Sequence, residues 1–292
     1  MRWLHPTLAL STFVLAGSVL RAQDWRADAS LTWADNLSRT SYAPDRLNAA
    51  LYDGSVSGEW RRQLAPDWST GVELETGFEQ VRPYPGLDSV HLGTKVNFLR
   101  KFGLGPFAPV LTLSGSAARY DLHENGRSAW KVDAGVSVSK RLTEAWRVTA
   151  SGSWDEEYAK AHPFDVINRR LSLETAWEVV NGWELSAGGS RLWGQLTANA
   201  NQDIFQQALE GGFGPAVASY YNSVAYAHSW SYGDDWVAYR IDCRADMWWL
   251  GLGVALGDNT SLPLRYEAVK VINRANVAYK SDFWSLSIVH RF

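Results

Sequence analysis

Hydrophobic and polar residues alternate along most of the chain after its first two dozen positions. The alternation is clearest over residues 24–36, 68–79, 130–139 and 171–179, where every second residue is apolar or aromatic and most of the others are charged or small. A period of two belongs to a β-strand with one apolar and one polar face. The pattern therefore predicts an all-β protein, although a soluble sandwich would show the same alternation.

The connections between these segments alternate between short and long. The short ones are residues 65–67, 103–106, 142–145, 180–182, 232–235 and 257–261. The longer ones are residues 35–50, 82–88, 121–127, 159–165 and 195–215, with less distinct ones near 244–246 and 272–280. Short turns at one rim and long loops at the other are typical of a transmembrane antiparallel up-and-down β-barrel. With both termini at the short-turn rim, the spacing predicts about 14 strands, or 12 if the 232–235 hairpin projects beyond the membrane.

Tryptophan spacing separates a membrane barrel from a soluble sandwich. Several strands begin with Trp just after a short turn and carry a second aromatic residue eight or ten positions later, on the same face. The pairs are Trp25–Trp33, Trp68–Phe78, Trp146–Trp154 and Trp183–Trp193. On a strand tilted by about 40°, such a pair spans roughly 20–25 Å, close to the apolar band between the two aromatic girdles of a barrel.

The C-terminal segment, residues 284–292, has apolar or aromatic residues at alternate positions and ends in Phe292. This segment resembles the terminal strand of bacterial outer-membrane β-barrels. The resemblance implies that the barrel-assembly machinery recognises the strand ending in Phe292, and that outer-membrane lipid surrounds the protein. It is a resemblance to the superfamily as a whole, across the mature chain, and it implies no ligand-binding or catalytic residue.

The N-terminus predicts export. Arg2 gives a basic start, residues 8–20 form a short apolar run, and Ala22 stands at a plausible cleavage position. We therefore expect a signal peptide over residues 1–22 and a single barrel domain over residues 23–292. Together with the barrel pattern, this predicts the outer membrane of a Gram-negative-type bacterium.

The face opposite the tryptophans would line the lumen, and acids outnumber bases on it. The pore-lining candidates are Glu73, Glu75, Glu79, Lys95, Lys131, Asp133, Glu174, Glu178, Arg240 and Asp242. A polar, slightly anionic lining predicts a porin-like channel for small hydrophilic solutes. The alternatives are a closed structural or surface barrel in which these charges pair with one another, and an outer-membrane enzyme acting on lipid. Loop 195–215, with a short helix expected over 203–210, is the candidate for an internal constriction.

The segment that starts at Trp236 fits the pattern least well. Trp236 shares its register with Arg240 and Asp242, whereas Ile241 and Cys243 belong to the apolar face. We expect a bulge or an inward-facing Trp236 there, with Arg240 and Asp242 in the lumen.

Composition narrows the function classes. A mean hydropathy of -0.24 excludes a polytopic helical membrane protein, and a net charge of -3 gives no case for nucleic-acid binding. The one cysteine, Cys243, cannot form an intrachain disulfide. The six histidines are scattered, and neither a metal-ligand spacing nor a nucleophile or nucleotide-binding motif occurs. We therefore predict neither enzyme activity nor a metal or cofactor.

Overall fold

The computed structural model describes residues 24–202 and 226–292, and the expected signal peptide lies outside these ranges. Twelve antiparallel strands form a closed wall, because β1 to β9 are followed by β11 to β13, β9 pairs with β11, and β13 pairs with β1. The strands of the wall are β1 (Asp24–Ala34), β2 (Ala49–Ala65), β3 (Trp68–Arg82), β4 (Ser89–Lys101), β5 (Val110–Leu122), β6 (Ala129–Arg141), β7 (Trp146–Ala159), β8 (Val166–Val180), β9 (Trp183–Asn201), β11 (Trp236–Ala255), β12 (Thr260–Asn273) and β13 (Ala278–Arg291). One further short strand, β10 (Tyr226–His228), pairs only with β11.

The predicted barrel is confirmed with 12 strands, and the expectation of 14 is wrong. The difference arises at β11, which runs without interruption through residues 244–246, where a loop was expected. Asp246 pairs with Arg191 of β9 on one side and with Lys270 of β12 on the other, so no turn occurs there. Residues 232–235 belong to the connection between β10 and β11, outside the barrel wall.

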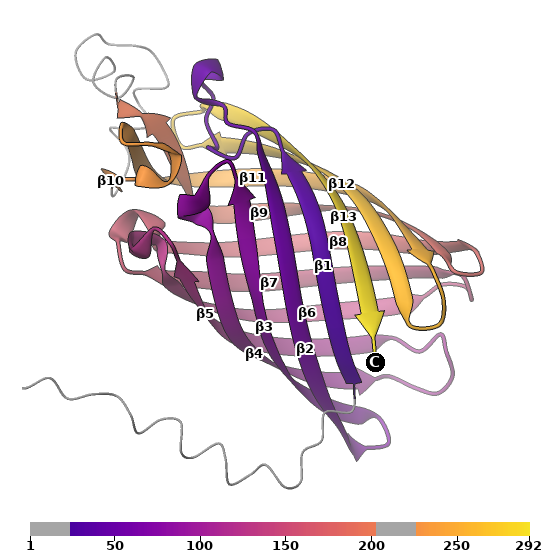
Figure 1. Cartoon of the computed structure of the whole chain (residues 1–292). Helices are drawn as coiled ribbons and strands as arrows, with labels where there is room; N and C mark the ends of the chain where they lie inside the picture. Colours follow the sequence, from indigo (N-terminus) through magenta and orange to yellow (C-terminus); the bar gives the residue numbers. More distant parts are fainter. Residues whose placement is uncertain (1–23, 203–225) are drawn as a thin grey trace, which may run out of the picture.

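The two rims differ as the connection lengths predict (Figure 1). Strand β1 begins and β13 ends at the rim of short connections, where the Phe292 N–H donates a hydrogen bond to the Trp25 carbonyl. The other rim carries single-turn 3-10 helices: η2 (Ala43–Asp45), η3 (Pro85–Leu87), η4 (Asn125–Arg127), η5 (His162–Phe164) and η6 (Trp230–Tyr232). Among the described residues, no helix is long and apolar enough to cross a membrane.

The outward surface of the wall is apolar. Leu173 and Val136 lie on it, and Leu173 keeps 60% of its surface exposed. Aromatic residues gather towards the rim that carries the 3-10 helices, which we call the outer rim. Trp33 is the cross-strand partner of Trp284, whose ring centroid lies 4.7 Å from that of Tyr266. This arrangement corresponds to one girdle of a membrane barrel.

Strands β9 and β11 extend beyond the wall at the rim of the 3-10 helices. The pairing of β9 with β8 stops at Gly194, the pairing of β11 with β12 stops at Cys243, and these two residues are partners. Beyond this point, residues 195–201 and 236–242 pair with each other and with β10 only, and we call this two-stranded segment the mouth ribbon. Gly194 permits the departure, because a Cβ atom there would lie 2.2 Å from the Ile167 carbonyl oxygen.

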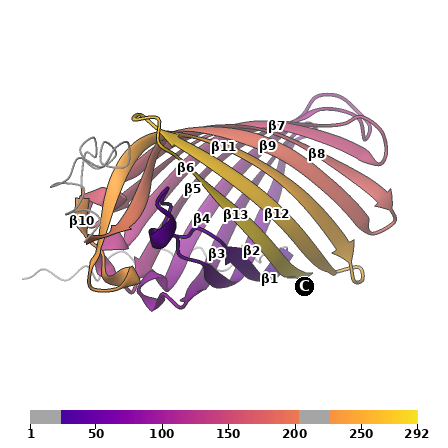
Figure 2. The same ribbon diagram turned by 90° about the horizontal axis from the view of Figure 1, so that it is seen from above.

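The mouth ribbon is packed on both faces. Its apolar face, with Tyr239 and Ile241, forms a buried cluster with Val271 and Tyr279 at the outer ends of β12 and β13. Its other face is hydrogen-bonded to the loops: the Thr197 hydroxyl donates to the Pro163 carbonyl at 2.8 Å, and the Asn199 side-chain oxygen accepts from Arg127 at 2.9 Å. At the edge of the ribbon, the Asn199 N–H donates to the Ser38 carbonyl at 2.9 Å. Viewed from above, this end of β9 and β11 bends away from the line of the wall (Figure 2). The ribbon is therefore a fixed part of the outer mouth.

Candidate functional site

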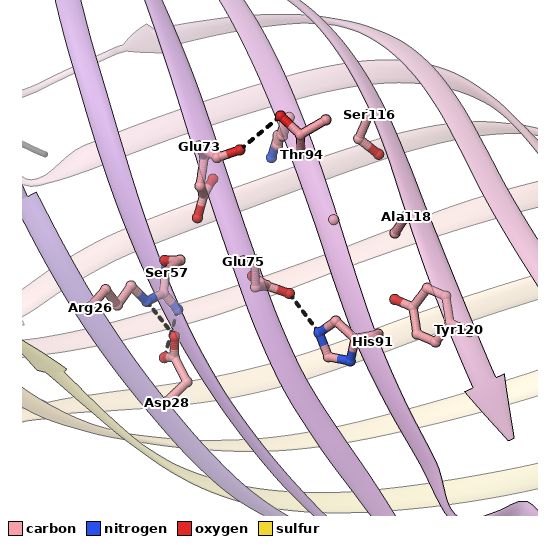
Figure 3. Close-up of a pocket in the computed structure, with 12 residues that line it drawn as sticks. Arg26, Asp28, Ser57, Glu73, Glu75, His91, Thr94, Ser116, Ala118 and Tyr120 are labelled. Carbon is pink, nitrogen blue, oxygen red and sulfur yellow. Dashed lines mark hydrogen bonds and ion pairs between the residues drawn. The ribbon is translucent and has the colours of Figure 1, made fainter. Parts of the chain in front are cut away.

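The candidate site is the barrel lumen, which holds two cavities. The inner cavity has a volume of about 290 Å³ and lies against the inward faces of β1 to β5 (Figure 3). Charged and polar side chains dominate its lining, with Glu73, Glu75 and Lys95 on β3 and β4. Arg26 and Asp28 of β1 form an ion pair at 2.7 Å on the same lining. The cavity can therefore hold water and a small polar solute.

A series of polar and aromatic contacts runs along the inner surface of the wall from β3 to β7. The Glu75 carboxylate lies 3.1 Å from His91 Nε2, and the His91 ring stacks on Tyr120 with centroids 5.0 Å apart. Lys131 places its ammonium group 4.3 Å from the Tyr120 ring centroid and 3.4 Å from the Glu157 carboxylate. Lys131 thus has both an aromatic face and a carboxylate beside it.

The His91 ring occupies space that is free because residue 77 is a glycine. Gly77 lies opposite His91 across the strand pair, and a Cβ atom at Gly77 would be 2.6 Å from the His91 ring. Alternation along β3 puts Gly77 on the same inward face as Glu75. The glycine therefore lets His91 lie against the wall rather than project across the lumen.

The outer cavity, of about 470 Å³, shares Glu75, His91 and Tyr120 with the inner one, so the two are parts of one lumen. Towards the outer mouth its lining passes to Arg127 and Phe164 of the loops and to Leu196 and Thr197 of the mouth ribbon. The ribbon and the loops therefore bound the lumen at this end.

A buried ion pair ties the outer loops together. The Arg127 guanidinium donates to the Glu124 carboxylate at 2.8 Å, and their side chains are only 11% and 4% exposed. Arg127 also donates to Asn199 of the ribbon at 2.9 Å and to Ser229 at 2.8 Å, and its guanidinium carbon lies 4.2 Å from the Phe164 ring centroid. No local sequence pattern predicts this cluster, because its members lie as far apart in the chain as Glu124 and Ser229.

Eight of the ten pore-lining candidates lie on the inward side of the wall. Glu73, Glu75 and Lys95 line the inner cavity, and Glu79 and Lys131 line the outer one. Asp133 accepts a hydrogen bond from Ser116, which itself lines the inner cavity. Glu174 and Glu178 alternate with the outward Leu173 and Trp177 on β8, away from both cavities.

Arg240 and Asp242 lie elsewhere, which differs from the sequence-based expectation. Arg240 donates to the Asp165 carbonyl at 2.7 Å, and Asp242 accepts from Gln195 at 3.0 Å and pairs with Arg274 at 3.1 Å. At this level the residues packed towards the inside are Ile241 and Cys243. The apolar face of β11 was assigned to lipid, but here the strand belongs to the mouth ribbon, whose apolar face is buried against protein. Helix 203–210 of the expected constriction lies outside the described residues.

Catalytic chemistry finds little support in the part of the chain that the structure describes. That part contains no group of three or more His, Cys, Asp or Glu residues arranged to hold a metal ion. Its one hydroxyl–imidazole contact joins Thr260 and His290 at 2.8 Å, at the rim of short turns. His290 packs against the Phe292 ring, with centroids 4.6 Å apart, and among the described residues no carboxylate orients it. A nucleophile–base pair without an orienting group is a poor candidate for catalysis.

No known family model matches the chain. Over 121 residues the chain is 29% identical to Surface lipoprotein assembly modifier 1 of Neisseria meningitidis serogroup B, covering 40% of this chain and 24% of that protein. The chain therefore matches about a quarter of the length of this curated relative.

One of the similar solved structures shares the fold. An outer-membrane channel from Pseudomonas putida F1 aligns with a TM-score of 0.56 and 12% identity, over 92% of this chain and 94% of that one. The KdgM porin in complex with disordered oligogalacturonate aligns with a TM-score of 0.47 and 6% identity, over 91% of this chain and 99% of that one. This chain therefore shares its fold, a closed antiparallel β-barrel, with the channel from Pseudomonas putida F1.

Proposed function

We propose that this protein spans the outer membrane and forms a channel for small hydrophilic solutes, with its outer mouth narrowed by the mouth ribbon. The observation that carries the proposal is the lumen itself, in which two cavities with charged and polar linings share Glu75, His91 and Tyr120. A closed structural barrel would not need such a wetted interior. The apolar outward face and the aromatic girdle support the membrane location.

Conductance in planar bilayers tests the channel. We expect the purified full chain to conduct ions with a preference for cations, because Glu73 and Glu75 face the inner cavity. The double change Glu73→Gln with Glu75→Gln should lower the ratio of cation to anion permeability. Glu156→Gln is the matched control, because Glu156 shares the outward face with Ile167.

Two results would count against the channel. One is the absence of conductance both in the natural chain and in Arg127→Ala, which releases the ribbon and the loops from the buried ion pair. The other is an unchanged permeability ratio when both lumen carboxylates are neutralised. Either result would favour the closed structural barrel.

The position of the C-terminus supports a further proposal about biogenesis. Phe292 lies at the rim of short turns with 73% of its surface exposed. We propose that the barrel-assembly machinery recognises β13 through this residue. Deleting Phe292 should reduce the amount of heat-modifiable barrel in outer-membrane fractions, while barrel refolded from denaturant into detergent should be unaffected.

A second candidate function rests on the sequence match to the Neisseria protein, whose name describes assembly of surface lipoproteins. We propose as the alternative that this barrel takes part in placing lipoproteins on the cell surface. Cells with and without the gene can be labelled with radioactive palmitate and treated with external protease. Loss of protease-sensitive labelled lipoproteins in the deletion strain, restored by the natural chain, would support this function; an unchanged pattern would exclude it.

A further inference from the structure

Basic side chains gather on the outward surface of β8, β9 and β11 to β13, near the outer rim. Cross-strand pairing connects Arg191 to Asp246, Asp246 to Lys270, and Lys270 to Lys280, and it places Trp193 between Arg169 and Arg244. Neighbouring positions in such rows are about 5 Å apart. We call this group of five bases the basic belt: Arg169, Arg191, Arg244, Lys270 and Lys280.

The basic belt carries more positive charge than its neighbours neutralise. Asp246 forms ion pairs with two of the five bases, with Arg191 at 2.5 Å and with Arg244 at 3.6 Å. Across residues 24–202 and 226–292, no carboxylate lies within ion-pair distance of Arg169, Lys270 or Lys280. These three cations are therefore available to a ligand.

The opposite side of the barrel lacks this surplus. Near the same rim, Arg82 pairs with Asp88 at 3.0 Å, and Arg119 pairs with Asp121 at 2.7 Å. The positive charge is thus concentrated on one side of the outward surface. A general requirement for basic residues at the membrane interface would not produce this asymmetry.

An apolar groove of about 670 Å³ runs down the outward surface from the basic belt. Val136 of β6 and Leu171 of β8 form its sides, Trp154 and Trp193 border it, and Arg169 lies on its lining. Its floor is at Gly152 of β7, where a Cβ atom would meet Leu171 Cδ2 at 3.3 Å. An apolar groove that begins at a cation has the polarity of a site for a lipid chain and its charged headgroup.

We propose that the groove and the basic belt together bind a phosphorylated glycolipid of the outer leaflet. One acyl chain lies in the groove over Gly152, and a headgroup phosphate is held by Arg169, with Lys270 and Lys280 adding attraction along the belt. The inference rests on the proposed membrane orientation, in which termini and short turns face the periplasm. That orientation puts the belt at the headgroup level of the outer leaflet. Arg suits the phosphate because its guanidinium donates two parallel hydrogen bonds to phosphate oxygens.

Native mass spectrometry of the detergent-solubilised full chain tests the headgroup site, with diphosphorylated lipid A as the probe. Each Lys or Arg near an anionic lipid surface contributes about fivefold in affinity. We therefore expect Arg169→Gln to weaken lipid A binding about fivefold, and Arg169→Gln with Lys270→Gln to weaken it about 25-fold. Arg119→Gln is the matched control, because Arg119 is an outward base near the same rim, away from the groove; it should bind like the natural chain.

The groove has its own pair of variants. Gly152→Leu fills the floor and should weaken lipid A binding at least fivefold. Ala29→Leu, at an exposed position on the outward face of β1 away from the groove, should have no effect. Dephosphorylated lipid A should bind as weakly to the natural chain as lipid A does to the double variant. Inorganic phosphate, which lacks the chain, should show no binding at lipid A concentrations.

The outcomes separate the parts of the proposal. Equal binding by the double variant and the natural chain would overturn the role of the basic belt, and equal binding by Gly152→Leu would overturn the groove. Tight binding of inorganic phosphate would show an anion site without lipid recognition and would also overturn it. Conductance of the same variants should match that of the natural chain, so failure of this proposal is distinguishable from failure of the channel. Extraction of the chain from membranes without detergent would instead refute the membrane location on which both depend.

Discussion

The barrel wall and the mouth ribbon show the same alternation of apolar and polar residues, yet their apolar faces meet different surroundings. In the wall, Leu173 and Val136 point outward and are exposed. In the ribbon, Tyr239 and Ile241 retain only 6% of their surface and pack against Val271 and Tyr279. A period of two therefore reports that a strand has two faces, but it does not report what covers the apolar one. The distinction appears only when the neighbours of each strand are known. The pairing of β9 with β8 ends at Gly194, and the pairing of β11 with β12 ends at Cys243.

The largest expected effect lies in the buried Glu124–Arg127 pair, which contacts Asn199 on the ribbon's polar face. Glu124→Ala leaves the Arg127 guanidinium buried without its carboxylate, and removing one partner of such a pair costs about 3–5 kcal/mol. The loss should be local, so hydrogen exchange should accelerate in residues 123–128, 196–201 and 229–231 while the strands of the wall stay protected. Exposed Glu144→Ala, at the opposite rim, is the control. Unchanged protection at the mouth would show that the pair does not hold the ribbon.

The wall is tested by placing charge on each of its faces. Leu173→Arg or Val136→Arg should cost about 2–4 kcal/mol in folding into lipid vesicles, because both side chains point into the bilayer. Ser172→Arg and Ser137→Arg, each one residue away and directed into the lumen, should be much milder. Greater sensitivity at the serine sites would mean that inside and outside are exchanged, and the proposed lumen would be lost with them.

Most of the wall was predictable because its physics is local. Alternation and turn residues located the strands around Trp68, Trp130 and Trp183, and the even tryptophan spacing predicts that the wall spans a membrane. The strand count failed at residues 244–246, where two charged residues, Arg244 and Asp246, point outward and imitate a loop. Asp246 pairs with Arg244 on the same strand and with Arg191 on β9, and periodicity cannot reveal the partner on the neighbouring strand.

The candidate site was predictable only in part, for the same reason. Alternation within the wall placed Glu73, Glu75 and Lys131 on the inward side, where the cavities lie. It misplaced Arg240 and Asp242, because the ribbon leaves the wall before those residues. The contacts at the outer mouth could not be predicted from the sequence, because pairs such as Ser231 and Glu124 are 107 residues apart in the chain. Loop packing depends on which side chains the closed barrel brings together, not on any local pattern.

A smaller effect sharpens the comparison between the two apolar faces. Ile241→Val removes one methylene group from the packed ribbon and should cost about 0.5–1.5 kcal/mol, as in a protein core. Ile288→Val removes the same group from a lipid-facing side chain that is 45% exposed, and lipid can fill the space, so the cost should be close to zero. Equilibrium unfolding in detergent or vesicles measures both. Equal costs would mean that the ribbon is no better packed than the lipid-facing surface.

The smallest expected effect is a pH dependence of the contact between the ribbon and the β1–β2 loop. Asp45 of η2 accepts a hydrogen bond from the Asn201 N–H at 3.3 Å, and burial raises the pKa of the Asp45 carboxyl above its ordinary value. A carboxyl with a raised pKa in the folded state stabilises that state when protonated, and this contribution is lost as the pH rises through the folded pKa. Protection of residues 35–48 from hydrogen exchange, corrected for the intrinsic rate, should therefore increase as the solution is acidified from pH 7. Asp45→Asn keeps an acceptor for Asn201 without a charge and should remove this dependence, whereas Asp258→Asn in a short turn at the opposite rim should leave it intact. A pH profile that is the same in Asp45→Asn as in the natural chain would assign the effect to another group.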